Sequence, residues 1–261
     1  MKSVYYNNDN PHYQYVLGLG DDCLVLGQRW AEWLGKGPNL ELDIASSNLS
    51  LDLFGQADLW LGYAAELQGE GKTADDLAML RDAPAFRNHW LCEQPNSDWG
   101  VTTARMVMFS LYQYIRYERL TKSSDPRIAE IAAKALKEVT YHVRFSSEWC
   151  MRLGQGTEES HRRLQKGVNE LWRFVAELFE TPDWERDLAD KGIAVASEDI
   201  REEWDQQIAD LFEAAGLTRP ESTGRVIGSR HNGHHSEHLG HLLCEMQFLQ
   251  RAYPSTAGNV W

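Results

Sequence analysis

One pair of residues in this sequence has the spacing of a metal-binding motif: Glu158 and His161, the only Glu-x-x-His of the chain. Helical bundles that hold two irons use two such pairs, with one further carboxylate from each of two other helices. The spacing matters because residues i and i+3 lie on the same face of a helix. Glu158, however, follows Thr157 at the start of a predicted helix, where acidic residues favour the helix dipole. We therefore interpret Glu158 as part of a helix start and not as a metal ligand.

His142 is the second histidine that could bind iron, because it lies on the apolar stripe of a predicted long helix. A complete motif needs a glutamate three residues earlier, but Val139 is there and Glu138 lies four residues away. In another predicted long helix, Phe54 and Ala57 occupy the same spacing on the inner face. Without carboxylates at these positions little can hold iron, so we expect His142 to be a hydrogen-bonded core residue.

Polar residues also interrupt two of the apolar helices. Asn48, Asp52 and Gln56 follow one another at intervals of four, which places them on one face of a helix. They could line a polar channel or the relic of a metal cavity, but we favour a solvated face or one hydrogen-bonded to a neighbouring helix. Asp21 and Asp22 could likewise face the interior of a bundle. Adjacent aspartates more often face water, and we expect this here.

The histidine-rich segment near the C-terminus is the best competing metal candidate. If residues 234–245 are helical, His234, His238 and His241 share one face, and Glu245 lies four residues further on. Imidazoles with this spacing can bind zinc or nickel. Two glycines, Gly233 and Gly240, interrupt the segment, which argues against a regular metal-binding helix there. Elsewhere the chain has no nucleophile-elbow pattern and no glycine-rich phosphate loop. We therefore predict no catalytic, cofactor-binding or metal-binding residue in this chain.

The composition limits the classes of function. The chain has 261 residues and a net charge of −13, which disfavours binding to nucleic acids and to anionic membranes. No stretch has the roughly 20 apolar residues of a membrane span, and no N-terminal signal core is present, so we expect a cytoplasmic protein. Four cysteines lie far apart in or beside apolar runs, where we expect them to be free and buried: Cys23, Cys92, Cys150 and Cys244.

A helical period dominates the elements that must position these side chains. The second predicted helix is apolar on several sides, which indicates a central position in the fold. Asp125 and Pro126 mark the start of a later helix as N-cap and first residue. We expect helices at about 14–35, 41–69, 102–121, 126–153, 157–180, 200–215 and 236–252, one helical turn around 73–82, and an irregular segment at 183–200.

This order of elements predicts an all-α fold. Long helices with a long crossover between the second and the third match the ferritin-like long-helix bundle. We place the bundle core at about 14–180 and additional C-terminal helices at about 183–252. No repeat and no low-complexity linker divides residues 1–261, so we expect a single domain.

Several long runs of the sequence resemble a known family, the C subunits of the bacterial phenylacetyl-coenzyme A epoxidase (the PaaC family). The resemblance covers roughly residues 14–252 and is carried by YVLGLGDDCLVLGQRWAEWLG, LDIASSNLSLDLFGQADLWLGYAAELQGEG, EQPNSDW, KALKEVTYHVRFSSEWCMRLGQGT, LWRFVAELFE and EHLGHLLCEMQFLQR. In the epoxidases of this kind, a separate catalytic subunit carries the di-iron centre that epoxidises the aromatic ring. Members of the PaaC family have a similar fold and pair with that subunit but have lost the metal ligands.

The resemblance implies a non-catalytic structural subunit of an oxygenase complex, a hetero-oligomer that needs no cofactor in this chain, with the di-iron centre in the partner. Ten Trp, ten Tyr and eight Phe fit a large core together with a partner surface, and we expect an apolar patch on a long helix. Two alternatives stay open. One is a ferritin-like oxygenase subunit with an atypical metal site that includes His142, Asp52 and Glu138, and the other is a metal-binding module that uses the C-terminal histidines.

Overall fold

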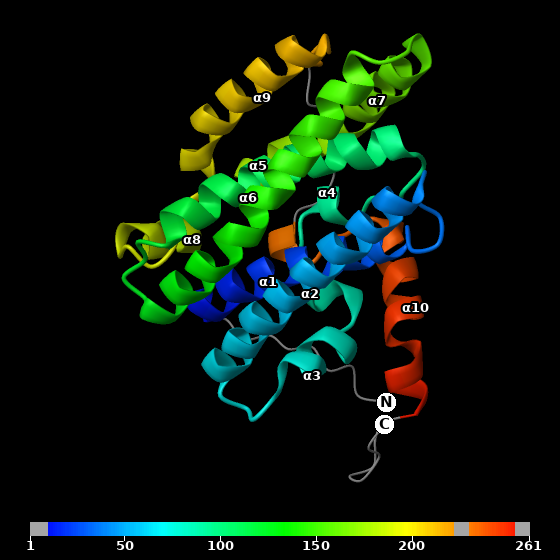
Figure 1. The fold of residues 1–261 in the computed structure, drawn as a ribbon. Helices are drawn as coiled ribbons and strands as arrows, with labels where there is room; N and C mark the ends of the chain where they lie inside the picture. The colour runs from blue at the N-terminus through cyan, green and yellow to red at the C-terminus, as the bar shows by residue number, and fades with distance from the viewer. Residues whose placement is uncertain (1–9, 222–229, 254–261) are drawn as a thin grey trace.

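The computed structural model describes residues 10–221 and 230–253, and these ranges are mostly helical. Four long helices form two hairpins, each joined by a short turn: α1 (Pro11–Ala31) with α2 (Leu40–Gln68), and α5 (Trp99–Leu120) with α6 (Pro126–Gly154). The two hairpins pack into a bundle in which α2 also contacts α6 (Figure 1). The fold is the ferritin-like all-α bundle that the sequence predicted.

Cap residues explain why these helices start where they do. The side chain of Asn39 accepts a hydrogen bond from the backbone N–H of Leu42 at 2.9 Å, at the start of α2. Asp125 accepts from the N–H groups of Arg127 and Ile128 at 2.8 and 3.2 Å, at the start of α6. Each cap satisfies N–H groups that have no partner within the helix. The predicted start of α6 at Asp125–Pro126 is therefore confirmed.

A long crossover joins the two hairpins. It runs from Gly69 to Asp98 and contains only short helices: α3 (Ala74–Met79), η1 (Ala83–Ala85) and α4 (Trp90–Glu93). The helical turn predicted around 73–82 corresponds to α3, whose N-cap residue Thr73 forms a capping box with Asp76. Within the crossover, α3 packs against α2, and α4 contacts α1 and α5.

The chain after the bundle consists of shorter helices that pack on its outside. These are α7 (Glu158–Leu171), η2 (Trp172–Phe179), α8 (Asp183–Asp190), η3 (Ser197–Ile200), α9 (Arg201–Ala215), η4 (Arg230–Asn232) and α10 (Glu237–Ala252). The prediction that residues 183–200 are irregular was wrong, because α8 lies there. Leu188 and the carboxylate of Glu185 are buried on α8, so tertiary contacts stabilise a helix whose sequence is mostly polar.

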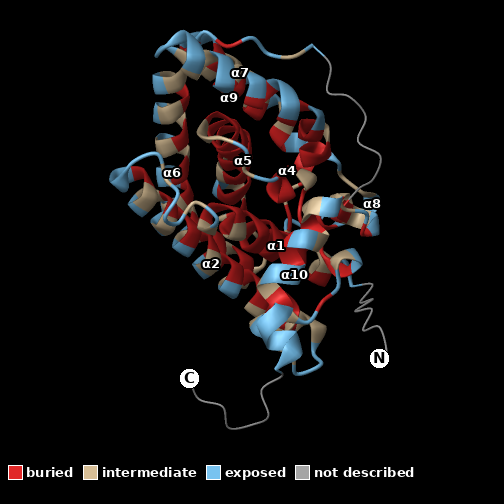
Figure 2. Cartoon of the chain, turned by 90° about the vertical axis from the view of Figure 1, so that its right-hand side faces the viewer, coloured by how far each residue is buried: buried red, intermediate tan, exposed pale blue. Residues whose placement is uncertain are grey.

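The central helices are α1 and α5, and not α2 as the sequence indicated. Sixteen of the 21 residues of α1 and 18 of the 22 residues of α5 are buried, against 12 of 29 in α2. Figure 2 shows α1 and α5 in red within the surrounding helices. Gly27 of α1 allows close packing, because a Cβ atom there would lie 2.8 Å from the ring of Phe54 on α2. From these counts, α2 has apolar side chains that are not buried within this chain.

Candidate functional site

The centre of the bundle holds a hydrogen-bonded cluster with one side chain from each of the four long helices: Cys23, Gln56, Gln113 and Glu138. The Cys23 thiol and the Gln113 amide both lie within hydrogen-bonding distance of Gln56 Oε1, at 3.6 and 3.4 Å. Gln113 Nε2 also donates to Cys23 Sγ at 3.4 Å. Gln56 Nε2 donates to Glu138 Oε2 at 2.8 Å and so links α2 to α6. We refer to these residues, with Tyr117 and Trp60, as the central cluster.

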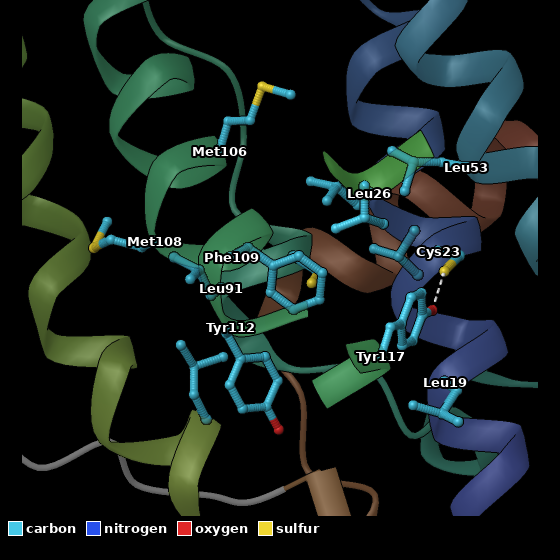
Figure 3. Close-up of a cluster of buried hydrophobic side chains, with 14 of the residues drawn as sticks. Leu19, Cys23, Leu26, Leu53, Leu91, Met106, Met108, Phe109, Tyr112 and Tyr117 are labelled. Carbon is cyan, nitrogen blue, oxygen red and sulfur yellow. Dashed lines mark hydrogen bonds between the residues drawn. The ribbon is translucent and has the colours of Figure 1, made fainter. Parts of the chain in front are cut away.

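Tyr117 completes the central cluster on the side of α5. Its hydroxyl accepts hydrogen bonds from Trp60 Nε1 at 3.0 Å and from Gln113 Nε2 at 3.1 Å. It lies 3.5 Å from Cys23 Sγ, the contact that Figure 3 draws as a dashed line. Apolar residues such as Leu19, Leu26 and Leu53 surround the pair in the same view. Cys23, Gln56, Gln113, Tyr117 and Trp60 are therefore enclosed in the hydrophobic core, and Glu138 is half-buried at the edge of the cluster.

Burial keeps the cluster close to neutral. It raises the pKa of the Cys23 thiol to about 12 and the pKa of the Tyr117 hydroxyl well above its usual value. Both groups are thus protonated at neutral pH, and a thiol is a poor metal ligand compared with a thiolate. The amides of Gln56 and Gln113 carry no charge at any pH. Glu138 brings the one carboxylate to this network.

These donors do not fit a di-iron centre. A site of that kind takes four carboxylates and two imidazoles from the four helices, because anionic ligands must balance the charge of two irons. In the central cluster of this bundle, α1 contributes a thiol, and α2 and α5 contribute amides. The sequence analysis placed Phe54 and Ala57 at the ligand positions on the inner face of α2. In the structure, the side chain of α2 that joins the central cluster is Gln56. Gln113 and Cys23 were missed, because neither belongs to a known ligand spacing.

His142 lies beside the cluster and not within it. Its side chain is buried, and its Nε2 lies 3.1 Å from Oδ2 of Asp52 on α2. The prediction of a hydrogen-bonded core histidine is confirmed. The favoured interpretation of the polar stripe on α2 also holds, since Asp52 and Gln56 both bond across to α6 and Asn48 is exposed to solvent.

The prediction that Asp21 and Asp22 face water was wrong, because both carboxylates are buried. Asp21 forms a buried ion pair with Arg81 of the crossover, accepting from Arg81 Nη1 at 2.9 Å, and it also accepts from the backbone N–H of Arg87 at 2.8 Å. Asp22 accepts from the N–H of His89 at 2.8 Å and contacts the ring Nδ1 of His89 at 2.9 Å. The two aspartates therefore anchor the crossover to α1.

Neighbouring groups set the ionisation state of this anchor. Burial acts to raise the pKa of Asp22, but the contact with His89 and the positive charges of Arg230 and Arg116 outweigh it and hold that pKa below its usual value. Burial, together with Arg230, lowers the pKa of His89 to about 3, so the imidazole is neutral at pH 7. The anchor thus consists of an ionised carboxylate and a neutral imidazole.

The C-terminal histidines do not form the predicted constellation. The helix α10 begins at Glu237, so His234 lies before it and does not share a face with His238 and His241. In this segment His235 has buried contacts, since its ring nitrogens lie 3.0 Å from Glu93 Oε2 and from the backbone oxygen of Phe86. Across residues 10–221 and 230–253, no group of three or more His, Cys, Asp or Glu residues has the arrangement of a metal site.

The two remaining sequence candidates have structural roles in the fold. His161 Nδ1 lies 2.8 Å from the backbone oxygen of Gly154, and Glu158 is exposed in the first turn of α7 behind the N-cap Thr157. Of the four free cysteines, Cys23, Cys92 and Cys150 are buried, but Cys244 is exposed on α10, against expectation. Within the described residues, no helix is long and apolar enough to cross a membrane.

The chain matches the family of phenylacetic acid catabolic proteins over residues 2–259, which is nearly its full length. The chain belongs to this family. It is similar to the C subunit of 1,2-phenylacetyl-CoA epoxidase from Escherichia coli (strain K12), with 45% identity over 247 residues that cover 95% of this chain and 98% of the relative. It is also similar to the A subunit of the same enzyme, with 27% identity over 107 residues that cover 39% of this chain and 35% of that relative. The family thus includes two different subunits of one epoxidase.

Proposed function

We propose that this chain is the non-catalytic, structural subunit of an epoxidase that acts on phenylacetyl-CoA in aerobic phenylacetate catabolism. It pairs with a subunit that carries the di-iron centre and stabilises it, and the assembly is a cytoplasmic hetero-oligomer. The near full-length likeness to the C subunit of an epoxidase supports the assignment to this enzyme. The likeness to the A subunit supports a partner of related fold.

The central cluster is the observation that carries the non-catalytic role. It occupies the part of a ferritin-like bundle where metal ligands from four helices converge. In this chain, that place is filled by side chains that hydrogen-bond to one another, with donors from Gln113 and Trp60 and acceptors on Gln56 and Tyr117. A network with satisfied donors and acceptors is stable in a buried core without any ion. The cluster therefore joins α1, α2, α5 and α6 by hydrogen bonds, as a metal would join them in the catalytic subunit.

Metal analysis combined with reconstitution tests the proposal. The purified chain, after removal of weakly bound metal, should contain no stoichiometric iron, and it should not oxidise phenylacetyl-CoA alone. Mixing it with the A subunit and the remaining epoxidase subunits should give more activity than those proteins show without it. About two tightly bound irons per chain, the content of a di-iron bundle, would contradict a structural role and favour the alternative of an atypical metal site that includes His142, Asp52 and Glu138.

A further inference from the structure

The outward face of α2 carries large aliphatic side chains that no part of the described chain covers. Leu40, Ile44 and Leu51 are 70%, 53% and 66% exposed, although most aliphatic residues of this size lie in the core. Further along the same helix, Gly55 and Gly62 have open space where a side chain would be, since a Cβ atom at either position would meet nothing within 4 Å. We call these five residues the outer stripe of α2.

The outer stripe runs straight along the helix. At about 100° per residue, its five positions fall within an arc of about 60°, and the exposed Asp58 lies in the same arc, between the two glycines. The aliphatic residues occupy the first half of α2 and the glycines the second half. Glycine is unfavourable inside a helix, by roughly 1 kcal/mol relative to alanine, so the exposed Gly55 and the half-buried Gly62 on one seam need a reason. Small residues on a helix face allow a second helix to approach closely, and aliphatic residues at this spacing pack against its side chains.

The charge of α2 indicates what kind of helix fits. Five acidic residues lie on α2, and it has no lysine and no arginine: Glu41, Asp43, Asp52, Asp58 and Glu66. A second copy of this chain, docked by the same face, would bring two such helices together, and neither helix has a basic side chain to pair with the acidic residues of the other. Like charges across an interface oppose association. The chain as a whole, at −13, adds to this repulsion.

We infer that the outer stripe of α2 is the docking surface for a long helix of the catalytic subunit, one with an apolar seam flanked by lysine and arginine. The inference rests on the proposed function, which supplies the partner, and it adds the place of contact and the chemistry of the contacting helix. A straight seam on a 29-residue helix matches another long helix in shape. The aliphatic side chains in the first half of α2 would pack against the partner helix, and the glycines in the second half would let the two backbones approach closely. Together these contacts would fix the position of the partner helix along α2.

Binding measurements between this chain and the A subunit of the same organism's epoxidase test the inference. In the first variant, Gly55→Trp, a bulky ring blocks close approach while open space around Gly55 leaves the fold undisturbed. In the second variant, Leu51→Asp, a carboxylate replaces an exposed anchor. The matched control is Ala214→Trp, at an exposed position on α9 away from the stripe. Circular dichroism and melting temperature establish that each variant folds.

We expect Gly55→Trp and Leu51→Asp each to weaken binding of the A subunit by about 30-fold or more, as residues at the centre of an interface do. The control should bind like the unchanged chain. In a third variant, Asp58→Lys, association should slow at low salt, and the difference should disappear at high salt, where the charges are screened.

Three results would overturn the inference. If the unchanged chain binds the A subunit and the folded stripe variants bind equally well, the docking surface lies elsewhere and the proposed function stands. If the unchanged chain forms a dimer with itself that Gly55→Trp dissociates, the stripe is a surface between copies of this chain. If the unchanged chain does not bind the A subunit at all, the proposed function fails, and the inference fails with it.

Discussion

The amides of Gln56 and Gln113 differ from glutamates by one atom each, yet that difference decides what the centre of this bundle can hold. A carboxylate accepts hydrogen bonds and carries charge, whereas an amide donates as well as accepts. Gln113 Nε2 uses this donor capacity toward Gln56 and Tyr117, and Gln56 Nε2 uses it toward Glu138. Two carboxylates in the same places would lack these donors and repel one another unless a cation lay between them.

Converting both amides to carboxylates should therefore make the fold dependent on metal. In the double variant Gln56→Glu and Gln113→Glu, two new carboxylates lie near that of Glu138, and we expect a loss of about 3 to 5 kcal/mol in stability without metal. Manganese or ferrous ion at a hundredfold excess over its dissociation constant should recover about 2.7 kcal/mol. Melting curves with and without metal measure this. The unchanged chain and a double variant with leucine at both positions serve as controls, and an equal response of all three to metal would argue against this account of the cluster.

His142 presents the opposite case, a residue type that suggests chemistry but forms a buried hydrogen bond between two helices here. Its ring lies 3.1 Å from Asp52 and joins α6 to α2. Replacing His142 by Gln should change the unfolding free energy by about 1 to 3 kcal/mol, as expected for a disturbed buried polar group. The activity of the reconstituted complex should fall only in proportion to the loss of folded chain. A well-folded His142→Ala chain that assembles normally but leaves the complex inactive would reveal a chemical role.

At the scale of elements, the long helices were predictable and their surroundings were not. The expected ranges 41–69 and 126–153 differ by one residue at each end, or less, from α2 (Leu40–Gln68) and α6 (Pro126–Gly154), because cap residues and hydrophobic period are local signals. The burial of Asp21 depends on Arg81, which is 60 positions away in the chain. A local sequence pattern cannot indicate an ion-pair partner that is so far away in the sequence.

The same limit applies to the central cluster. The absence of paired glutamates and histidines was evident from spacing alone, but the identity of the groups that replace them was not. Cys23 resembles an ordinary core residue, and Gln113 lies in an apolar run with no spacing that marks it. Only the convergence of α1, α2 and α5 at one level of the bundle brings their side chains together.

The anchor between α1 and the crossover should make stability depend on pH in a defined window. In the folded chain the pKa of His89 is about 3, whereas an unfolded histidine has an ordinary pKa of about 6.5. Below pH 6.5 the unfolded state therefore binds a proton that the folded state does not, and stability falls with decreasing pH. This one group accounts for a loss of about 2 kcal/mol between pH 7 and pH 5.

The variant His89→Asn isolates that contribution. Its unfolding free energy is expected to be lower than that of the unchanged chain at pH 7, but the gap should narrow by about 2 kcal/mol at pH 5. Urea titrations at the two pH values give both numbers, and the comparison cancels every titrating group that the variants share. A gap that stays constant from pH 7 to pH 5 would mean that His89 is not held neutral in the fold.

At the scale of the whole molecule, the charge of −13 and the apolar residues on α2 point in the same direction. Strong net charge keeps an isolated chain from associating with its own copies, while an uncovered apolar stripe is typical of a surface that binds another molecule. A partner with basic residues around an apolar helix face would both offset the negative charge and cover the apolar stripe. The structural component of an enzyme has this requirement, because its only contact with the reaction is through the partner that it holds.

Partnership therefore has a thermodynamic consequence that acts on both chains. Ferritin-like proteins that associate through long helices form obligate interfaces on the order of 2,000 Å² or more. Anything that binds the folded state of a protein raises its apparent stability, so each partner should raise the melting temperature of the other. We expect the catalytic subunit to be less soluble or less active when it is produced alone, and co-expression with this chain to yield one co-eluting complex. Size-exclusion chromatography and melting curves of the separate and combined proteins measure both effects. A catalytic subunit with full activity and an unchanged melting temperature in the absence of this chain would exclude a stabilising role, because mass action does not allow tight binding without a shift in stability.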